Sequence, residues 1–218
     1  MENYMENNNV QIGGEIVKLP EFSHEVFEEK FYKFEIKTKR LSEYDDILPA
    51  IVSERLVNVE DIKLGDIVVI NGQFRSYNLQ TETRSKLVLS IFVKEIELTD
   101  DVNCLTLNDA TLIGYICKEP IYRKTPLGRE IADVLIAVNR TYRKSDYIPC
   151  ILWGRNAKYC DTLKVGDLVK LNGRIQSRNY EKKLQDGTII NKTAYEISVS
   201  KFASVEKEES EENEEEQE

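Results

Sequence analysis

The chain has 218 residues, of which 41% are hydrophobic, and a formal net charge of −9 at pH 7. This length fits one large domain or two small ones, and the hydrophobic fraction can build real cores, which excludes a wholly disordered chain. No apolar run approaches the roughly 18 residues that span a bilayer, and the N-terminus lacks the basic and apolar regions of a signal peptide. We therefore expect a cytoplasmic protein without a membrane partner.

The residue types that support catalysis or metal binding are scarce. The four cysteines never form a C-x-x-C pair and His24 is the only histidine, which argues against a disulfide framework, a structural zinc and any cofactor. There is no phosphate-binding G-x-x-x-x-G-K-[ST] loop and no G-x-S-x-G motif. We expect no enzymatic activity, a solvated loop position for His24, and small apolar roles for the cysteines, with Cys160 alone a candidate for thiol reactivity.

The charge is distributed very unevenly along the chain. Residues 1–107 hold 12 Lys or Arg against 20 Asp or Glu, residues 108–203 hold 17 against 10, and residues 204–218 hold 1 against 9. A basic segment therefore lies between two acidic ones. The last segment has no aromatic residue, Ile or Leu, so we predict a disordered acidic tail, which either improves solubility or mimics a polyanion and recruits a partner.

An internal repeat divides the chain into two units. Asp46–Ile51 parallels Asp146–Ile151 at an offset of 100, and Leu64–Asn78 parallels Val165–Asn179 at an offset of 101. The constant order and spacing of such matches predict a tandem duplication. The predicted domains are residues 1–102, residues 103–203, and the tail at residues 204–218.

Each unit has the pattern of several short strands separated by turn residues, with one short helix. Asn156–Leu163 is the predicted helix of the second unit, and Pro126–Gly128 and Gln185–Gly187 are predicted turns. Five strands with a helix between the third and fourth predict an all-β chain of two tandem OB-folds, which are five-stranded Greek-key barrels. The predicted strands of the second unit are Ala110–Ile116, Ile131–Asn139, Tyr147–Trp153, Asp167–Arg178 and Ile189–Val199.

The fourth strand of each unit alternates between two faces. In the second unit Val169, Leu171 and Ile175 fall on the inward side, and Gly173 between them permits the bend of a barrel corner. The first unit shows the same alternation, but Ile67 and Val69 fall on its outward side. They are either a covered face or two isolated surface residues.

Aromatic and basic residues are interleaved in the second unit. Barrels of this type bind single strands by stacking bases on aromatic rings while cations hold the phosphates. The stacking candidates are Tyr142, Tyr147, Trp153 and Tyr180, although the strand positions of Tyr147 and Trp153 also suit a core role. The phosphate-binding candidates are Arg123, Lys124, Arg140, Arg143, Lys144, Arg155, Arg174, Arg178, Lys182 and Lys183.

Residues 108–202 resemble the bacterial single-stranded DNA-binding proteins through motifs in family order. The motifs are Asn108–Gly114, Pro120–Gly128, Ile136–Arg140, Asp146–Gly154 and Gly173–Tyr180. The resemblance implies that the four stacking candidates contact bases, and that two chains with two barrels each form a homodimer in place of the family's usual tetramer. It also implies docking of replication or repair proteins on the tail, although the usual terminal Phe is missing.

The first unit lacks the stacking set. Ser42, Ile47 and Ser53 stand at the positions of Tyr142, Tyr147 and Trp153, and Leu79 stands near that of Tyr180. We therefore expect the first unit to be a degenerate barrel with a structural or interaction role, and DNA affinity to concentrate in the second.

The favoured function is a nucleoid-associated protein that coats and protects single-stranded DNA in replication, repair or recombination. The alternative is an accessory protein-interaction module of a primosome or recombination complex with secondary nucleic-acid contact. RNA binding stays open because the same kind of barrel also stacks RNA bases.

Overall fold

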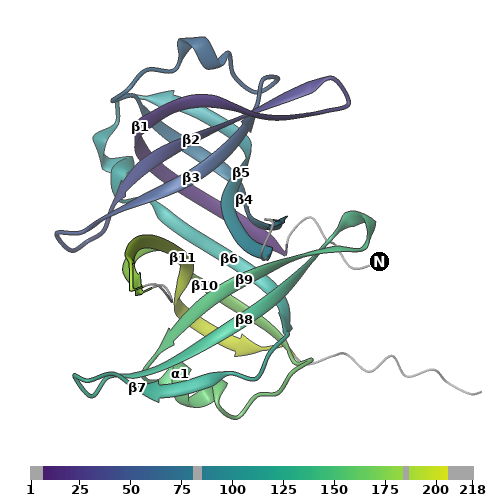
Figure 1. Ribbon diagram of the computed structural model, residues 1–218, viewed down its shortest axis with the longest axis vertical. Helices are drawn as coiled ribbons and strands as arrows, with labels where there is room; N and C mark the ends of the chain where they lie inside the picture. The colour runs from purple at the N-terminus through teal and green to yellow at the C-terminus, as the bar shows by residue number, and fades with distance from the viewer. Residues whose placement is uncertain (1–6, 81–84, 184–186, 206–218) are drawn as a thin grey trace, which may run out of the picture.

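The computed structural model describes residues 7–80, 85–183 and 187–205, and most of them lie in strands (Figure 1). The first predicted unit contains β1 (Asn8–Val26), β2 (Glu29–Lys39), β3 (Asp45–Ser53), the 3-10 helix η1 (Val59–Asp61), β4 (Ile67–Gln80) and β5 (Ser85–Thr99). The second contains β6 (Asn108–Ile116), β7 (Ile121–Lys124), β8 (Glu130–Arg140), the 3-10 helix η3 (Thr141–Arg143), β9 (Lys144–Trp153), α1 (Arg155–Cys160), β10 (Leu168–Lys183) and β11 (Ile189–Ser204). A further 3-10 helix, η2 (Val102–Thr106), connects them.

Each half of the chain forms a five-strand barrel. In the first, β1 pairs with both β2 and β4, and the parallel pair β3–β5 closes the ring. In the second, β6 pairs with β8 and β10, and the parallel pair β9–β11 closes the ring. The repeated sequence therefore folds into a repeated topology, stacked as two barrels in Figure 1.

The alternation predicted for the fourth strand is confirmed in both halves. Val169, Leu171 and Ile175 of β10 are almost completely buried. The register of β10 against β11 shifts between Asn172 and Gly173, as at a β-bulge. A β-carbon on Gly173 would meet the carbonyl oxygen of the facing strand, so glycine is required where the strand bends.

Two features differ from the sequence-based expectation. The strand β7 was not predicted, and it pairs with the edge of β8. The helix of the second unit, α1, ends at Cys160 rather than Leu163, because a turn bonded from Thr162 and Leu163 to the preceding carbonyls replaces its last residues. The short helix of the first unit, for which no bounds were predicted, is the 3-10 helix η1 with an Asn58 cap.

Two other predicted segments, a turn and the tail, lie partly outside the residues that the structure describes. Gly187 ends the second predicted turn with a φ of 87°, and Gln185 and Asp186 lie outside the described residues. Ser204 still belongs to β11, whereas residues 206–218 of the predicted tail lie outside the described part of the chain. Ile67 and Val69 are partly buried.

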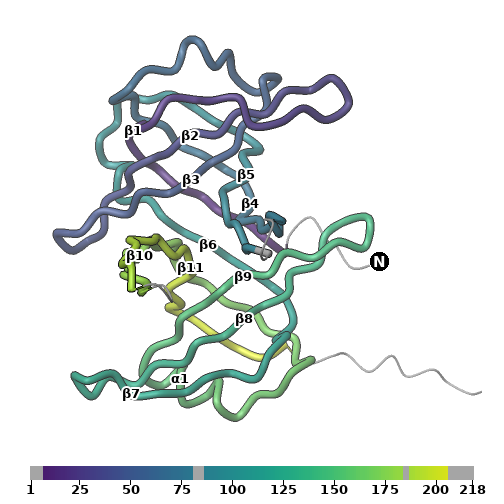
Figure 2. Tube along the Cα trace, viewed as in Figure 1, coloured from purple at the N-terminus to yellow at the C-terminus, as the bar shows by residue number. Residues whose placement is uncertain are grey.

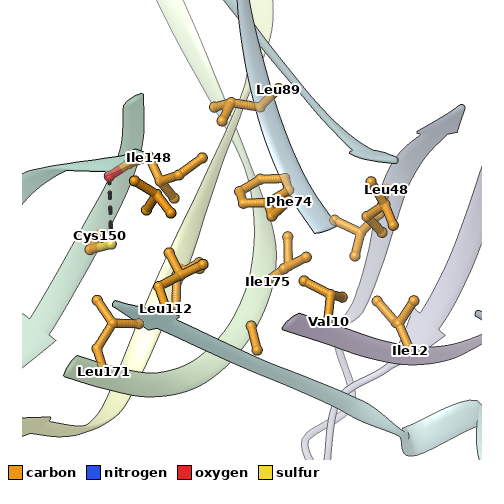
Figure 3. Close-up of a cluster of buried hydrophobic side chains, with 14 of the residues drawn as sticks. Val10, Ile12, Leu48, Phe74, Leu89, Leu112, Ile148, Cys150, Leu171 and Ile175 are labelled. Carbon is orange, nitrogen blue, oxygen red and sulfur yellow. Dashed lines mark hydrogen bonds between the residues drawn. The ribbon is translucent and has the colours of Figure 1, made fainter. Parts of the chain in front are cut away.

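The two barrels are joined through one continuous sheet. Strand β1 pairs antiparallel with β6, with Val10 opposite Ala110, so the eleven strands of the described residues form a single sheet. Buried side chains also form one cluster across both halves, in which Phe74 and Ile175 lie near the junction (Figure 3). The predicted boundary at residue 102 falls at the start of η2.

Matching carboxylates connect the barrels on either side of this junction. Asp46 in β3 accepts a hydrogen bond from the backbone N–H of Ser177 in β10 at 2.6 Å. Asp146 in β9 accepts the equivalent bond from the N–H of Ser76 in β4 at 2.7 Å. Both aspartates are fully buried, so each barrel places a charged side chain into the other and the pair fixes their relative position.

Candidate nucleic-acid interface

Tyr142 lies on the turn between β8 and β9. Tyr142 and Arg143 have φ values of 61° and 54°, the left-handed geometry of a tight hairpin connection. This turn leaves 93% of the Tyr142 side chain exposed. Its ring is therefore fully available to a ligand.

Tyr147 and Trp153 lie on the outer face of β9. The inward residues of this strand are Ile148, Cys150 and Leu152, all buried, so the odd positions point away from the core. Tyr147 is 41% exposed and Trp153 is 38% exposed, which excludes the core role considered for them. The indole Nε1 of Trp153 donates to Ser198 Oγ in β11 at 3.2 Å, so the edge of the ring is fixed.

Tyr180 lies toward the end of β10, at 38% exposure. The Arg178 guanidinium lies 5.8 Å from the centroid of its ring, a cation–π distance. Arg178 also lies 3.8 Å from Glu196. The positive charge of Arg178 therefore lies beside the Tyr180 ring.

The ten predicted phosphate-binding cations fall into two sets. The first set has a carboxylate neighbour: Arg123 with Asp133 (2.8 Å), Lys124 with Glu130 (3.9 Å), Arg140 with Asp146 (3.2 Å), Arg174 with Asp46 (3.3 Å) and Arg178 with Glu196 (3.8 Å). The second set is exposed and has no ion pair with any residue that the structure describes: Arg143, Lys144, Arg155, Lys182 and Lys183.

Two members of the paired set belong to the junction between the barrels. Arg174 binds Asp46 across the junction, and burial and the nearby Arg40 lower its pKa. Arg140 lies against buried Asp146 within the second barrel. Their charges already face a buried carboxylate, so they are less available to a phosphate than the exposed set.

Strand β7 adds two of the predicted cations to the edge of the sheet. Arg123 is opposite Ile131 of β8, and Ile131 is opposite Trp153 of β9. Arg123 therefore belongs to the same cross-strand row as the tryptophan. Glu130 beside it is held by Lys158, which lowers the pKa of that carboxyl.

The first barrel carries an aromatic row that the sequence comparison missed. His24 lies in β1, not in a loop as expected, and its exposed ring stacks on Phe31 of β2 with a centroid distance of 4.9 Å. Phe31 lies 6.0 Å from Phe92 of β5, and the Arg75 guanidinium lies 3.7 Å from the Phe92 centroid. The comparison of the two units in sequence considered only the positions equivalent to the four stacking candidates. The row lies on other strands, β1, β2 and β5.

In the first barrel, the positions equivalent to the stacking candidates also have different surroundings from those in the second barrel. Ser53, which stands where the second barrel has Trp153, is buried and donates its hydroxyl to Glu29. Ile47 and Leu79 are exposed. The first barrel thus has no ring at the Trp153 position.

Some kinds of site are absent from the described residues. No cluster of three or more His, Cys, Asp or Glu there could hold a metal ion. Within the same ranges, no helix is long and apolar enough to cross a membrane.

The fold defines a class of two-barrel proteins. It matches the wild-type single-stranded DNA binding protein from Thermus aquaticus with a TM-score of 0.72 at 13% identity, covering 92% of this chain and 93% of that one. A deletion mutant of the same protein matches with a TM-score of 0.70, 15% identity, and coverage of 94% and 97%. At these identities the likeness concerns the fold alone.

Residues 107–205 match the model of the single-strand binding protein family. Single-stranded DNA-binding protein A of Bacillus subtilis is 42% identical over 82 residues, which cover 34% of this chain and 48% of that protein. The single-stranded DNA-binding protein of Oceanobacillus iheyensis is 39% identical over 91 residues, covering 38% and 55%. The chain thus matches about half the length of these relatives. The family is non-enzymatic, as expected from the missing catalytic motifs.

Proposed function

We propose that this protein binds single-stranded DNA without sequence preference, and that it coats and protects the strand in replication, repair or recombination. The observation that carries the proposal is the outer face of β9, where exposed Tyr147 and Trp153 stand in the part of the chain that matches the family. Every base has a π-face, so rings at these positions can stack on any sequence.

Exposed cations are sequence neighbours of the two other candidate rings, Tyr142 and Tyr180. Arg143 and Lys144 flank the hairpin that bears Tyr142, and Lys182 and Lys183 follow Tyr180 on β10. These four cations have no acidic partner among the described residues. Binding of a phosphate to them therefore displaces only water and counterions and breaks no ion pair. Binding should weaken with salt, with a logarithmic slope of roughly −0.7 per phosphate neutralised.

Quenching of Trp153 fluorescence tests the proposal directly, because the chain has a single Trp. Titration with an oligo-dT of about 8 nucleotides, within the site size of one barrel, should quench the emission, most strongly at low salt. A duplex of the same length should compete poorly. Equal competition by the duplex, or no quenching, would overturn the proposal.

A pair of matched variants tests the stacking role of Tyr180. Tyr159 on α1 has nearly the same exposure, 39% against 38%, but its hydroxyl bonds to Ser204 and its ring packs against Phe202. Tyr180→Leu should weaken oligo-dT binding by roughly 5- to 150-fold, the loss of one stacked base. Tyr159→Leu should leave affinity unchanged. Equal affinity of the two variants would remove Tyr180 from the site.

We further propose the assembly and partners implied by the family resemblance. Two chains would form a homodimer with four barrels, and the acidic tail would dock replication or repair proteins. Light scattering with and without oligo-dT tests the first point, and a tail deletion in a partner pull-down with nuclease treatment tests the second. Competition between oligo-dT and oligo-U decides between DNA and RNA.

A further inference from the structure

Two hairpins at equivalent positions project from the two barrels. The acidic arm, residues 21–30, joins β1 to β2, and the basic arm, residues 121–130, joins β7 to β8. The strand pairing at the base of both arms has the same register, at an offset of 100 residues. In Figure 2 the acidic arm ends at the upper right of the first barrel and the basic arm at the lower left of the second. The two arms of one molecule therefore lie on opposite sides of it and cannot contact each other.

The tip of each arm exposes a large apolar side chain. Phe27 of the acidic arm is 95% exposed, and Leu127 of the basic arm is 84% exposed. Phe27 and Glu28 have φ values of 50° and 63°, a left-handed conformation that is unfavourable for a bulky side chain such as Phe. Asn or Gly would form the same turn at a lower cost. Neither the turn nor the barrel core therefore accounts for a Phe at this position.

Further apolar side chains extend this surface along the arms. Phe22 and Val26 of the acidic arm are exposed, and so is Ile121 of the basic arm. Among the described residues, the pairing of β2 with β3 begins only at Phe31, so the acidic arm is a two-stranded ribbon. Such a ribbon is marginally stable alone, and grouped apolar side chains on a surface mark a site of interaction. Each arm thus has the character of a contact surface.

The two arms carry opposite charges. Residues 21–30 hold four Glu against one Lys, whereas residues 121–130 hold three Lys or Arg against one Glu. Glu28 and Arg129, next to the apolar tips, are exposed and make no ion pair with a described residue. Four carboxylates around Phe27 would repel a phosphate backbone, so this ring does not suit DNA. Complementary charge instead makes each arm a suitable partner for the other.

We propose that the acidic arm of one molecule binds the basic arm of a second copy of this chain, with Phe27 packed against Leu127 and Glu28 facing Arg129. The two molecules use different surfaces, so the contact is heterologous and can repeat from copy to copy. Because the arms lie on opposite sides of the molecule, one neighbour cannot occupy both. The inference goes beyond the proposed function: the contact needs no DNA, and it continues association past the proposed homodimer.

Light scattering without DNA tests the contact. The average mass of the wild type should rise with protein concentration beyond two chains, and added salt should reduce it. Phe27→Asn removes the ring but suits the left-handed turn, and it should weaken this association by roughly 10- to 100-fold, the loss of one buried aromatic side chain. Tyr44→Asn, which removes an exposed ring from the β2–β3 turn, is the control and should associate like the wild type. Equal association of the two variants, or a wild-type mass that never exceeds two chains, would overturn the proposal.

Mixing of charge-reversed variants identifies the two surfaces. Glu28→Arg and Arg129→Glu each place like charges at the contact, so each variant alone should associate roughly 2- to 10-fold more weakly than the wild type. In an equimolar mixture the two reversed arms can face each other, as can the two unchanged arms, and association should recover. Glu43→Arg and Lys164→Glu, at exposed positions outside the arms, should each associate like the wild type without mixing. A mixture that associates no better than its components would overturn the pairing of these arms.

The outcome is distinguishable from that of the proposed function. Association is measured without DNA, so a failure of oligo-dT to quench Trp153 would not affect it. If Phe27→Asn weakened binding of the short oligo-dT but left association unchanged, the acidic arm would be a DNA contact and the proposal would fail. If Phe27→Asn reduced association and left quenching unchanged, the contact between copies would be supported.

Discussion

Asp46 and Asp146 stand at equivalent positions but are neutralised unequally. Asp46 accepts from Arg40 Nε and Nη2 at 2.8 and 2.6 Å and from Arg174 Nη1 at 3.3 Å. Asp146 has Arg140 at 3.2 Å, but its Oδ2 and the Arg140 Nε do not form an aligned hydrogen bond. Burial is the largest cause that raises the pKa of Asp146. The duplication therefore left one well-paired buried carboxylate and one poorly paired.

Substituting the two aspartates should reveal this difference. Asp46→Asn leaves two guanidinium groups without their carboxylate and should reduce the free energy of unfolding by about 3–5 kcal/mol. Asp146→Asn keeps an oxygen for the Ser76 N–H and should cost less than half as much. Equal losses in urea unfolding at pH 7 would contradict the unequal pairing.

The pH dependence of the Asp146 variant has a defined sign. Because the folded-state pKa of Asp146 is raised above the ordinary pKa of an aspartate, the folded protein binds the proton more tightly than the unfolded chain. This group therefore loses stabilising free energy as pH rises from the unfolded pKa through the raised one. Relative to wild type, Asp146→Asn should gain stability over that window in urea unfolding curves, and a relative loss would contradict the shift.

Cys160 does not have the environment of a reactive thiol. It is fully buried on α1, and burial raises its pKa to about 11. A thiol reagent at pH 8 should therefore leave Cys160 and buried Cys150 unlabelled in the folded protein and label both after unfolding. Partly exposed Cys104 and Cys117 serve as internal controls, and fast labelling of Cys160 in the native state would contradict its burial.

At the scale of elements, strand alternation was the most informative sequence pattern. A period of two assigned the inward face of β10 correctly, because burial on one face follows from the pleat. The same pattern could not identify β7, a four-residue edge strand with little burial. Nor could it give the bounds of η1, a three-residue helix without buried residues.

The close packing at the bend of β10 predicts that adding one methyl group at Gly173 destabilises the fold. Gly173→Ala would place its β-carbon against the Ser198 carbonyl oxygen and 2.9 Å from Ile197 Cγ2. We expect a loss of about 2–4 kcal/mol, because backbone and buried core must both move. Lys170→Ala, exposed on the same strand, should change stability by less than about 0.5 kcal/mol. Equal urea midpoints for the two variants would contradict the close approach.

At the scale of the whole molecule, the two barrels are joined by direct contacts as well as by the connecting segment at η2. The β1–β6 pairing, the common buried cluster and the two aspartates all cross the junction. We therefore expect one cooperative unfolding transition. Trp153 fluorescence, which reports the second barrel, should coincide in urea with circular dichroism, which reports both. Two separate midpoints would contradict the shared junction.

Only part of the candidate site could be predicted from the sequence. The four rings and ten cations of the second unit were predicted from the interleaving of aromatic and basic residues and from motif order, and their contact with DNA stays a prediction. The pairing of Arg174 with Asp46 spans 128 residues, and no local pattern indicates it. The aromatic row of the first barrel likewise draws on β1, β2 and β5.

Local order and periodicity therefore established the duplication, the strand faces and the uneven charge, because these depend on neighbours along the chain. The joining of two barrels into one sheet and the exchange of Asp46 and Asp146 were decided only in three dimensions. Alternation fixes which side of a strand is buried, but it does not specify which distant strand lies beside it.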